Sequence, residues 1–387
     1  MKLLKIAVSG LPLFRENCEI DFLGTQRVSA DNAEKMNCIF SSGEQNFYQN
    51  NVLSFIGINA SGKTSVLKLI TFVCGLLNNE AINNIPCREI LEGLDNVNES
   101  TFDIFFFANN NSVNLLHTVI VNTNGKFCIK DEFLKTKTVA KIKSKANVLN
   151  FDSCQTIITR KNDEDFLLDD VSIMVAFNKR NKEKITISDM LQYTNINKLS
   201  ISEDCPAELI AFFDPSIEYL HINKTGKEPD IRLKFKNSSE IILNQAEELN
   251  RYLSSGTIKG INTFFCAMKT FKTGGYLIID ELENHFNHEI VSTLIRFYMD
   301  KKVNPYGATL IFSTHYAELL DEFERNDNIY IMRNDNGITA ENLASILKRN
   351  DIKKSEAYQS GLLKGTTPQY DSYIDLKKHL MCSHKEV

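Results

Sequence analysis

The sequence predicts an α/β fold whose mixed sheet has a parallel core, an antiparallel meander and a helical insertion. Near the end of the chain, apolar strand-like runs alternate with amphipathic helical segments, which is typical of a parallel sheet covered by helices. Residues 100–133 break into strand-like pieces at Asn-rich and Asn-Gly turns, which indicates the meander. Residues from about 135 to 230 show little periodicity, and we expect the insertion there.

The elements follow from apolar spacing and from turn residues. Two short strands joined by a turn are expected at residues 3–12 and 17–24. A buried strand at 51–58 leads through a glycine loop into a helix at 63–79, whose apolar residues share one face. Later helices are expected at 257–271, 288–300 and 316–325, and later strands at 276–280, 308–315 and 328–334.

Composition restricts the class of protein. The 387 residues suffice for one large domain or two ordinary ones, with 43% hydrophobic and 24% charged residues. The net charge of −5 gives no overall attraction to nucleic acid or membranes, although the basic stretches 135–145 and 177–184 are either solvated faces or local patches. Nine scattered cysteines without a CxxC pair suggest neither disulfides nor zinc. No apolar run reaches the roughly 20 residues of a membrane span, so we expect a cytoplasmic protein.

The segment GINASGKT, Gly57–Thr64, satisfies the P-loop pattern GxxxxGK[ST] and lies between an expected strand and an expected helix. Glycines let backbone N–H groups turn toward phosphates, and the helix N-terminus adds its positive end. Lys63 would reach the β- and γ-phosphate oxygens, and the Thr64 hydroxyl would ligate Mg²⁺. An ordinary loop is the alternative that this context disfavours.

Two further apolar strands end in polar residues. The first, in YLIIDELENHFN, ends in Asp280 and Glu281, which at the carboxyl edge of a sheet would hold Mg²⁺ and polarise an attacking water. The second, LIFSTH, ends in His315, which would contact the γ-phosphate or that water. Taken alone, each could be an ordinary strand end with solvated side chains.

Together these motifs resemble the ABC-type ATPases, and among them the RecF/SMC-like AAA15 branch, which includes ATPases of bacterial abortive-infection and other phage-defence systems. The segment LSSGT, Leu253–Thr257, is similar to the ABC signature LSGGQ and lies one helix before the Asp-Glu strand. The resemblance implies that this segment binds the γ-phosphate of ATP held by a second subunit. The family's Q-loop glutamine has no counterpart at residues 105–110, where we looked for it.

The resemblance also implies a role for each matching residue. Glu281 would be the general base, His315 the switch histidine, and Asp280 with Thr64 the Mg²⁺ ligands, while 284–287 would be the D-loop. ATP would be bound by Gly57, Asn59, Ser61, Gly62, Lys63, Thr64 and Ser65 of one subunit and by Ser254, Ser255 and Gly256 of the other. ATP and Mg²⁺ are the expected cofactors.

Four regions are expected. Residues 1–125 would form the first half of the ATPase head and 126–240 a partly helical insertion. Residues 241–335 would form the second half of the head, and 336–387 a lid over the head or a docking segment.

We expect a slow ATPase that forms a homodimer, or a larger assembly, around ATP and regulates a separate effector protein in antiviral defence. No nuclease motif is found in the sequence, which places the output elsewhere. The alternative is a RecF-like ATPase that grips DNA in repair or recombination, so a nucleic-acid partner stays open. The third alternative is an inactive scaffold that keeps only the fold. It does not explain why Lys63, Asp280 and Glu281 are charged residues.

Overall fold

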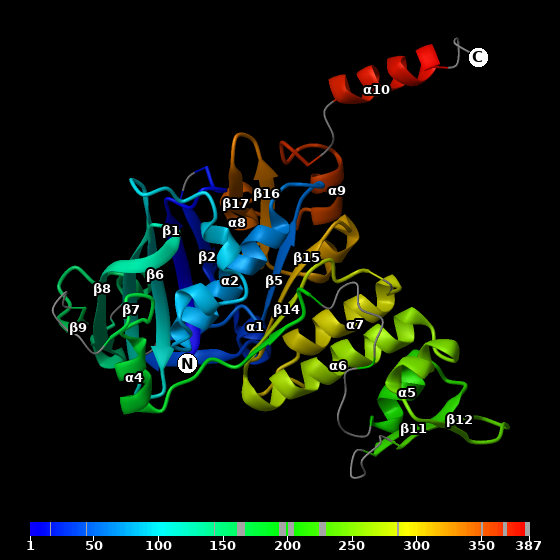
Figure 1. Ribbon diagram of the computed structural model, residues 1–387. Helices are drawn as coiled ribbons and strands as arrows, with labels where there is room; N and C mark the ends of the chain where they lie inside the picture. Colours follow the sequence, from blue (N-terminus) through cyan, green and yellow to red (C-terminus); the bar gives the residue numbers. More distant parts are fainter. Residues whose placement is uncertain are drawn as a thin grey trace.

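The computed structural model describes the chain except for residues 16, 44, 143, 161–166, 193–198, 200–204, 224–229, 285, 350, 367–369 and 384–387. The fold is mixed α/β, with parallel and antiparallel strands and with helices on both faces of the parallel sheet (Figure 1). This confirms the predicted α/β class with parallel and antiparallel strands. The meander, however, forms a sheet of its own and is not part of the sheet that contains the parallel core.

The parallel sheet carries the motifs. Its strands lie in the order β10-β14-β15-β5-β16-β17, and every neighbouring pair is parallel except β16 and β17. Their bounds are β5 (Val52–Ile56), β10 (Ile187–Asp189), β14 (Tyr276–Ile279), β15 (Thr309–Thr314), β16 (Ile329–Asn334) and β17 (Ile338–Asn342). Because β5, β14 and β15 are adjacent and parallel, the residues that follow them meet at one edge of the sheet.

The second sheet is antiparallel, in the order β2-β1-β6-β7-β8-β9. Its strands are β1 (Lys2–Ser9), β2 (Cys18–Asp21), β6 (Glu99–Ala108), β7 (Ser112–Thr123), β8 (Lys126–Thr138) and β9 (Thr156–Thr159). The boundary expected at residue 126 falls in the turn between β7 and β8, which pair from Thr123–Lys126 to Ser112–Thr138. The start of the expected insertion is therefore part of the meander.

Helix α2 (Lys63–Leu77) packs between the two sheets. Leu53 and Phe55 of the parallel sheet and Phe102 and Ile104 of the antiparallel sheet share one core cluster with it. The sequence predicted a single apolar face for this helix, but Leu67 and Phe72, outside that face, are also fully buried. A helix between two sheets is covered on opposite sides, so it is apolar almost all round.

The other face of the parallel sheet is covered by helices and by the chain after β15. These elements are α6 (Ser255–Thr273), α7 (His288–Met299), the 3₁₀ helix η5 (Ala317–Glu322), α8 (Leu343–Ile346) and α9 (Lys354–Gln359). The α-helix predicted at 316–325 was wrong in type and in its end. Arg325 and Asp327 enter a buried polar network, which turns the chain inward after η5.

The region after the meander is less helical than we expected. Beside short helices it holds a three-stranded antiparallel sheet with its own core. The strands of this sheet are β11 (Ile217–Asn223), β12 (Asp230–Phe235) and β13 (Ile241–Leu243). The short helices of the region are η3 (Val139–Lys141), α3 (Lys145–Val148), α4 (Met174–Asn181), α5 (Ala207–Phe213) and η4 (Ala246–Arg251). Helix α5 packs on α6 at Gly260, where a Cβ would lie 2.2 Å from the Phe213 ring.

The tail divides into two parts. Helix α9 packs against η5, where Ser355 donates to Asp321. Helix α10 (Tyr370–Ser383) instead stands off from the body, with Leu376 and Met381 exposed (Figure 1). The remaining elements are α1 (Ala30–Lys35), β3 (Cys38–Ser42), β4 (Gln45–Tyr48), η1 (Ile82–Asn84) and η2 (Arg88–Leu91).

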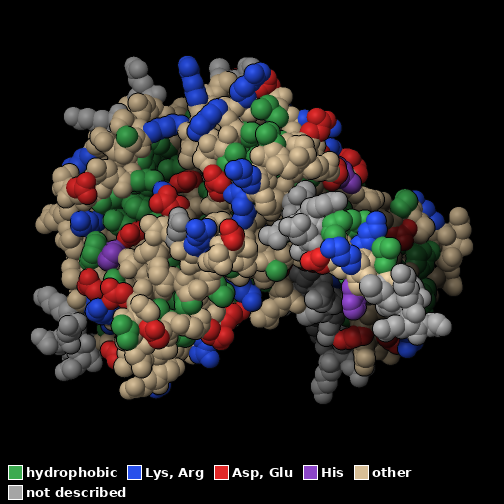
Figure 2. Space-filling model, turned by 90° about the horizontal axis from the view of Figure 1, so that it is seen from above, with side chains coloured by type: hydrophobic (Ala, Val, Ile, Leu, Met, Phe, Trp, Pro, Cys, Tyr) green, Lys and Arg blue, Asp and Glu red, His purple; other side chains and the backbone are tan. Residues whose placement is uncertain are grey.

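Acidic and basic side chains are interspersed over the face of the molecule seen in Figure 2, where no broad basic surface stands out. Across the described parts of the chain, each helix is too short or too polar to cross a bilayer.

Candidate functional site

The loop Gly57–Thr64 connects β5 to α2 and depends on glycine at two positions. Gly62 has a left-handed φ of 93°, and a Cβ there would lie 2.6 Å from the Ile338 side chain. A Cβ on Gly57 would approach the Met332 carbonyl oxygen to 2.6 Å. Ala60 also has a positive φ, of 61°. Only glycine avoids both clashes, so the loop can lie tightly against β16 and β17.

Lys63 opens helix α2 and points back over this loop. Its Nζ donates to the backbone oxygens of Gly57 (2.9 Å) and Ile58 (3.1 Å), and it lies 3.5 Å from Nδ1 of His315. The side chain is buried, and burial lowers the pKa of the ammonium, while the carboxylates of Asp280 and Glu281 oppose that shift. The result is a partly desolvated cation at a helix N-terminus, an arrangement suited to a phosphate.

A hydrogen bond joins the end of β14 to the start of α2. Thr64 Oγ1 donates to Asp280 Oδ2 at 2.7 Å. The other oxygen of that carboxylate accepts a hydrogen bond from Ser313 Oγ, at the end of β15. Residues from two other segments, at the start of α2 and the end of β15, therefore hold the Asp280 carboxylate in place.

Glu281 follows in an unusual backbone conformation. Its φ is +48°, in the left-handed region that non-glycine residues seldom occupy. Its N–H donates to Ser313 Oγ at 2.7 Å, and its carboxylate accepts from Asn284 Nδ2 and lies 3.6 Å from His315 Nε2. These contacts hold Glu281 in a strained backbone conformation, while its side chain is 42% exposed. Strained residues with accessible side chains are typical of functional sites.

Ser313 and Glu283 support this cluster, and sequence reasoning missed both. Ser313 bridges the Asp280 side chain and the Glu281 backbone. Glu283 is buried and accepts the backbone N–H of His315 at 2.6 Å, while its Oε2 has no hydrogen-bond partner among the described residues. No sequence pattern predicts a role for either residue. The one available signal is that Ser313 lies two positions before His315 in LIFSTH.

The signature-like segment Leu253–Thr257 lies at the start of α6. Ser254 is its N-cap, and the Ser254 side chain accepts from the backbone N–H of Thr257 at 3.0 Å. Ser254 is exposed, and Ser255 and Gly256 are half-buried in the first turn. Among the hydrogen bonds and ion pairs described above for Lys63, Thr64, Glu281 and His315, none involves residues 254–256.

Oxygen donors suited to Mg²⁺ are present where the sequence placed them. The Thr64 hydroxyl and the Asp280 carboxylate touch each other, and hard cations such as Mg²⁺ prefer oxygen ligands and keep several waters. Ser61 in the same loop is buried, and within the described part of the chain its Oγ has no hydrogen-bond partner. In the described ranges, no three His, Cys, Asp or Glu residues form a metal-binding group.

Asn59 of the loop and Ser65, which follows the loop, are the two remaining candidate nucleotide-binding residues on this side of the site. Asn59 is exposed, and Ser65 is half-buried in the first turn of α2.

The sequence matches no protein-family model and no curated protein.

Proposed function

We propose that this chain is an ABC-type ATPase, resembling the RecF/SMC-like AAA15 branch, which binds and slowly hydrolyses ATP. The observation that carries the proposal is the continuous chain of contacts between the loop after β5 and the ends of β14 and β15. It joins Lys63, Thr64, Asp280, Ser313, Glu281 and His315. The hydrophobic core requires none of these polar groups at the edge of a sheet.

In this proposal the loop Gly57–Thr64 holds the phosphates. Lys63 would exchange the carbonyl oxygens that it now contacts for phosphate oxygens, which bring the negative charge that the carbonyls lack. Thr64 and Asp280 would hold Mg²⁺, whose charge neutralises the β- and γ-phosphate oxygens. The unpartnered hydroxyl of Ser61 is a further group that could bond the nucleotide.

Glu281 is the proposed general base. Its carboxylate is exposed enough to meet a water molecule, while Asn284 and His315 fix its direction. The Ser313 hydroxyl couples the positions of Glu281 and Asp280, so that the base and the metal ligand keep their spacing. His315, held through its backbone by Glu283, lies between Glu281 and Lys63 and could follow the state of the γ-phosphate.

The proposed active unit is a homodimer. Ser254 is exposed at the N-terminus of the 19-residue helix α6, and the backbone N–H groups of a first helical turn bind anions. This segment makes no contribution to the phosphate loop of its own chain in the contacts described. A second copy could therefore bring it against bound ATP, so that each site would be built from two subunits.

Mixing two inactive variants tests this arrangement. Ser254→Arg blocks the segment of one subunit, and Lys63→Ala disables the loop of the other. We expect each variant alone to lose most ATPase activity. An equimolar mixture should regain up to about a quarter of the wild-type rate, because half of the subunits pair as mixed dimers with one intact site of two. A mixture as inactive as its components would contradict a shared site.

The proposed output is regulation of a separate effector protein in antiviral defence, as the family resemblance implies. The sequence contains motifs typical of ATP binding and hydrolysis, and no nuclease motif is found in it, which supports a partner that carries the toxic activity. Rapid cleavage of DNA or RNA by the purified chain alone would contradict this part of the proposal without affecting the ATPase itself.

A further inference from the structure

A polar cavity lies at the edge of the antiparallel sheet, beyond the point where β8 and β9 cease to pair. Its walls come from one segment, residues 136–157, which contains the end of β8, η3, α3 and the start of β9. Figure 1 shows this edge on the side of the molecule opposite to α6 and α7. The cavity has a volume of about 720 Å³, and small-molecule sites typically measure about 300–1,000 Å³. A small ligand therefore fits it, away from the residues of the phosphate loop.

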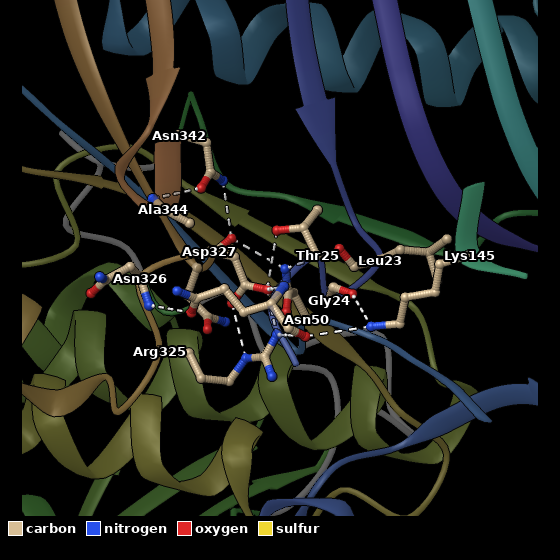
Figure 3. A network of polar contacts seen from close by, with 12 residues as sticks. Leu23, Gly24, Thr25, Asn50, Lys145, Arg325, Asn326, Asp327, Asn342 and Ala344 are labelled. Atoms are coloured by element: carbon tan, nitrogen blue, oxygen red, sulfur yellow. Dashed lines mark hydrogen bonds and ion pairs between the residues drawn. The ribbon is translucent and has the colours of Figure 1, made fainter. Parts of the chain in front are cut away.

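The cavity is lined by part of the basic stretch 135–145. Lys137 and Lys141 line it, and among the described lining residues there is no Asp or Glu. Lys145 instead points toward the backbone oxygen of Gly24, at 3.5 Å, within the polar network drawn in Figure 3. The sequence left open whether this stretch is a solvated face or a local patch. Two of its lysines form a patch at this cavity.

Lys137 is a buried cation for which the described residues provide no ionic partner. Its side chain is only 7% exposed. Its Nζ donates to the backbone oxygens of Asn147 and Asn150 and lies 4.1 Å from the centroid of the Phe151 ring. Burial lowers the pKa of this ammonium, and the nearby Cys154 thiol opposes that shift. Lysine is almost never buried this far unless it is paired. An anion in the cavity would supply the missing counter-charge.

The accessible part of the wall carries hydrogen-bonding side chains. The exposed lining residues with an amide or a hydroxyl group are Thr138, Asn147, Asn150, Ser153 and Gln155. Lys141 is exposed as well, and within the described ranges neither its ammonium nor the Gln155 amide makes a hydrogen bond. Because these side chains reach solvent and line the cavity, a ligand there can contact them directly.

The segment that forms the wall is anchored in an apolar core. Val139, Ile142, Val148 and Phe151 belong to one buried cluster. The Phe151 ring also contacts Phe105 of β6, with ring centroids 5.9 Å apart. The cavity is therefore formed before a ligand arrives, which keeps the ordering cost of binding low.

We propose that this cavity binds a small phosphorylated polyol, such as a sugar phosphate. A phosphate monoester carries a charge of about −1.5 to −2 and three strong acceptor oxygens, which match the two ammonium groups and the amide donors. Sugar hydroxyls donate and accept hydrogen bonds, as do the amides and hydroxyls of the wall. A nucleic-acid strand is disfavoured because its backbone needs a row of cations, and of the described residues only Lys137 and Lys141 provide them here. This proposal does not depend on ATP binding.

The test is titration of the full chain with ribose 5-phosphate and glucose 6-phosphate, by calorimetry and phosphorus NMR without nucleotide. We expect at least one of them to bind with a dissociation constant of about 1 mM or tighter. Ribose and glucose lack the charge, and inorganic phosphate lacks the polyol. Each should bind about tenfold or more weakly, because part of the wall then stays unpaired. A short oligothymidylate that binds more tightly than both sugar phosphates would overturn the proposal.

Two variants of the exposed wall locate the binding. Lys141→Gln removes one cation, and Gln155→Glu adds a carboxylate of nearly the same size. Neither side chain is buried, so both variants should fold, and each should weaken sugar-phosphate binding about tenfold or more. Lys130→Gln is the control, since Lys130 is exposed on β8 and pairs with Glu99 at 2.6 Å. It should bind as the wild type does.

Lys63→Ala separates this cavity from the phosphate loop. The variant should still bind the sugar phosphate, because Lys63 does not line the cavity. The proposal is overturned if neither sugar phosphate binds or if inorganic phosphate binds equally well. It is also overturned if both wall variants bind as tightly as the wild type, or if Lys63→Ala abolishes binding.

Discussion

Replacing Glu281 with glutamine is expected to slow ATP hydrolysis by about 100- to 10,000-fold while ATP still binds. The amide keeps the size of the side chain and can still contact Asn284 and His315, but it cannot take a proton from water. Phosphate release in single-turnover reactions measures the effect, and equilibrium binding of a fluorescent ATP analogue checks that affinity is retained.

Glu99→Gln is the matched control, since Glu99 is an exposed residue of β6 that pairs with Lys130. It should hydrolyse ATP at the wild-type rate. If Glu281→Gln also hydrolyses ATP at the wild-type rate, Glu281 is not the base, and its strained backbone needs another explanation.

Replacing Lys63 with alanine is expected to weaken ATP binding by about 100-fold, because a charged hydrogen bond to phosphate contributes about 1.5–3 kcal/mol. The variant should remain folded, since Lys63 contacts only loop carbonyls and the His315 ring and the helix behind it is held by the apolar core. Calorimetric titration with Mg·ATP measures the loss.

Lys68→Ala is the control on the same helix. Lys68 lies one turn further along and pairs with Glu89 at 3.1 Å, away from the loop. Its replacement should leave ATP affinity unchanged. Equal affinities of Lys63→Ala and the wild type would show that the loop Gly57–Thr64 does not hold phosphate.

The parallel core was predictable because its strands are continuous apolar runs that end in polar residues. The runs before Gly57, Asp280 and His315 became β5, β14 and β15, which lie side by side. Once these strands are adjacent and parallel, the three ends must come together. The contact of Lys63 with His315 and the hydrogen bond from Thr64 to Asp280 follow from that placement.

Other parts needed tertiary information that no local pattern carries. Phe72 is buried because a second sheet covers α2, and the sequence cannot show which distant strands provide that cover. Ser313 and Glu283 form hydrogen bonds with residues that are distant from them in the sequence. Local spacing in the sequence does not reveal such partners. In the region 139–251, short elements and weak alternation concealed the sheet formed by β11, β12 and β13. Local periodicity is least informative where strands are this short.

The central claim is that ATP joins two copies of this chain, and solution mass tests it most directly. The Glu281→Gln variant should be measured by light scattering, with and without Mg·ATP, against a chain mass of 44.1 kDa. We predict that ATP doubles the mass and that adding Ser254→Arg to the variant abolishes the increase. A mass that stays the same with and without ATP would contradict an ATP-switched dimer.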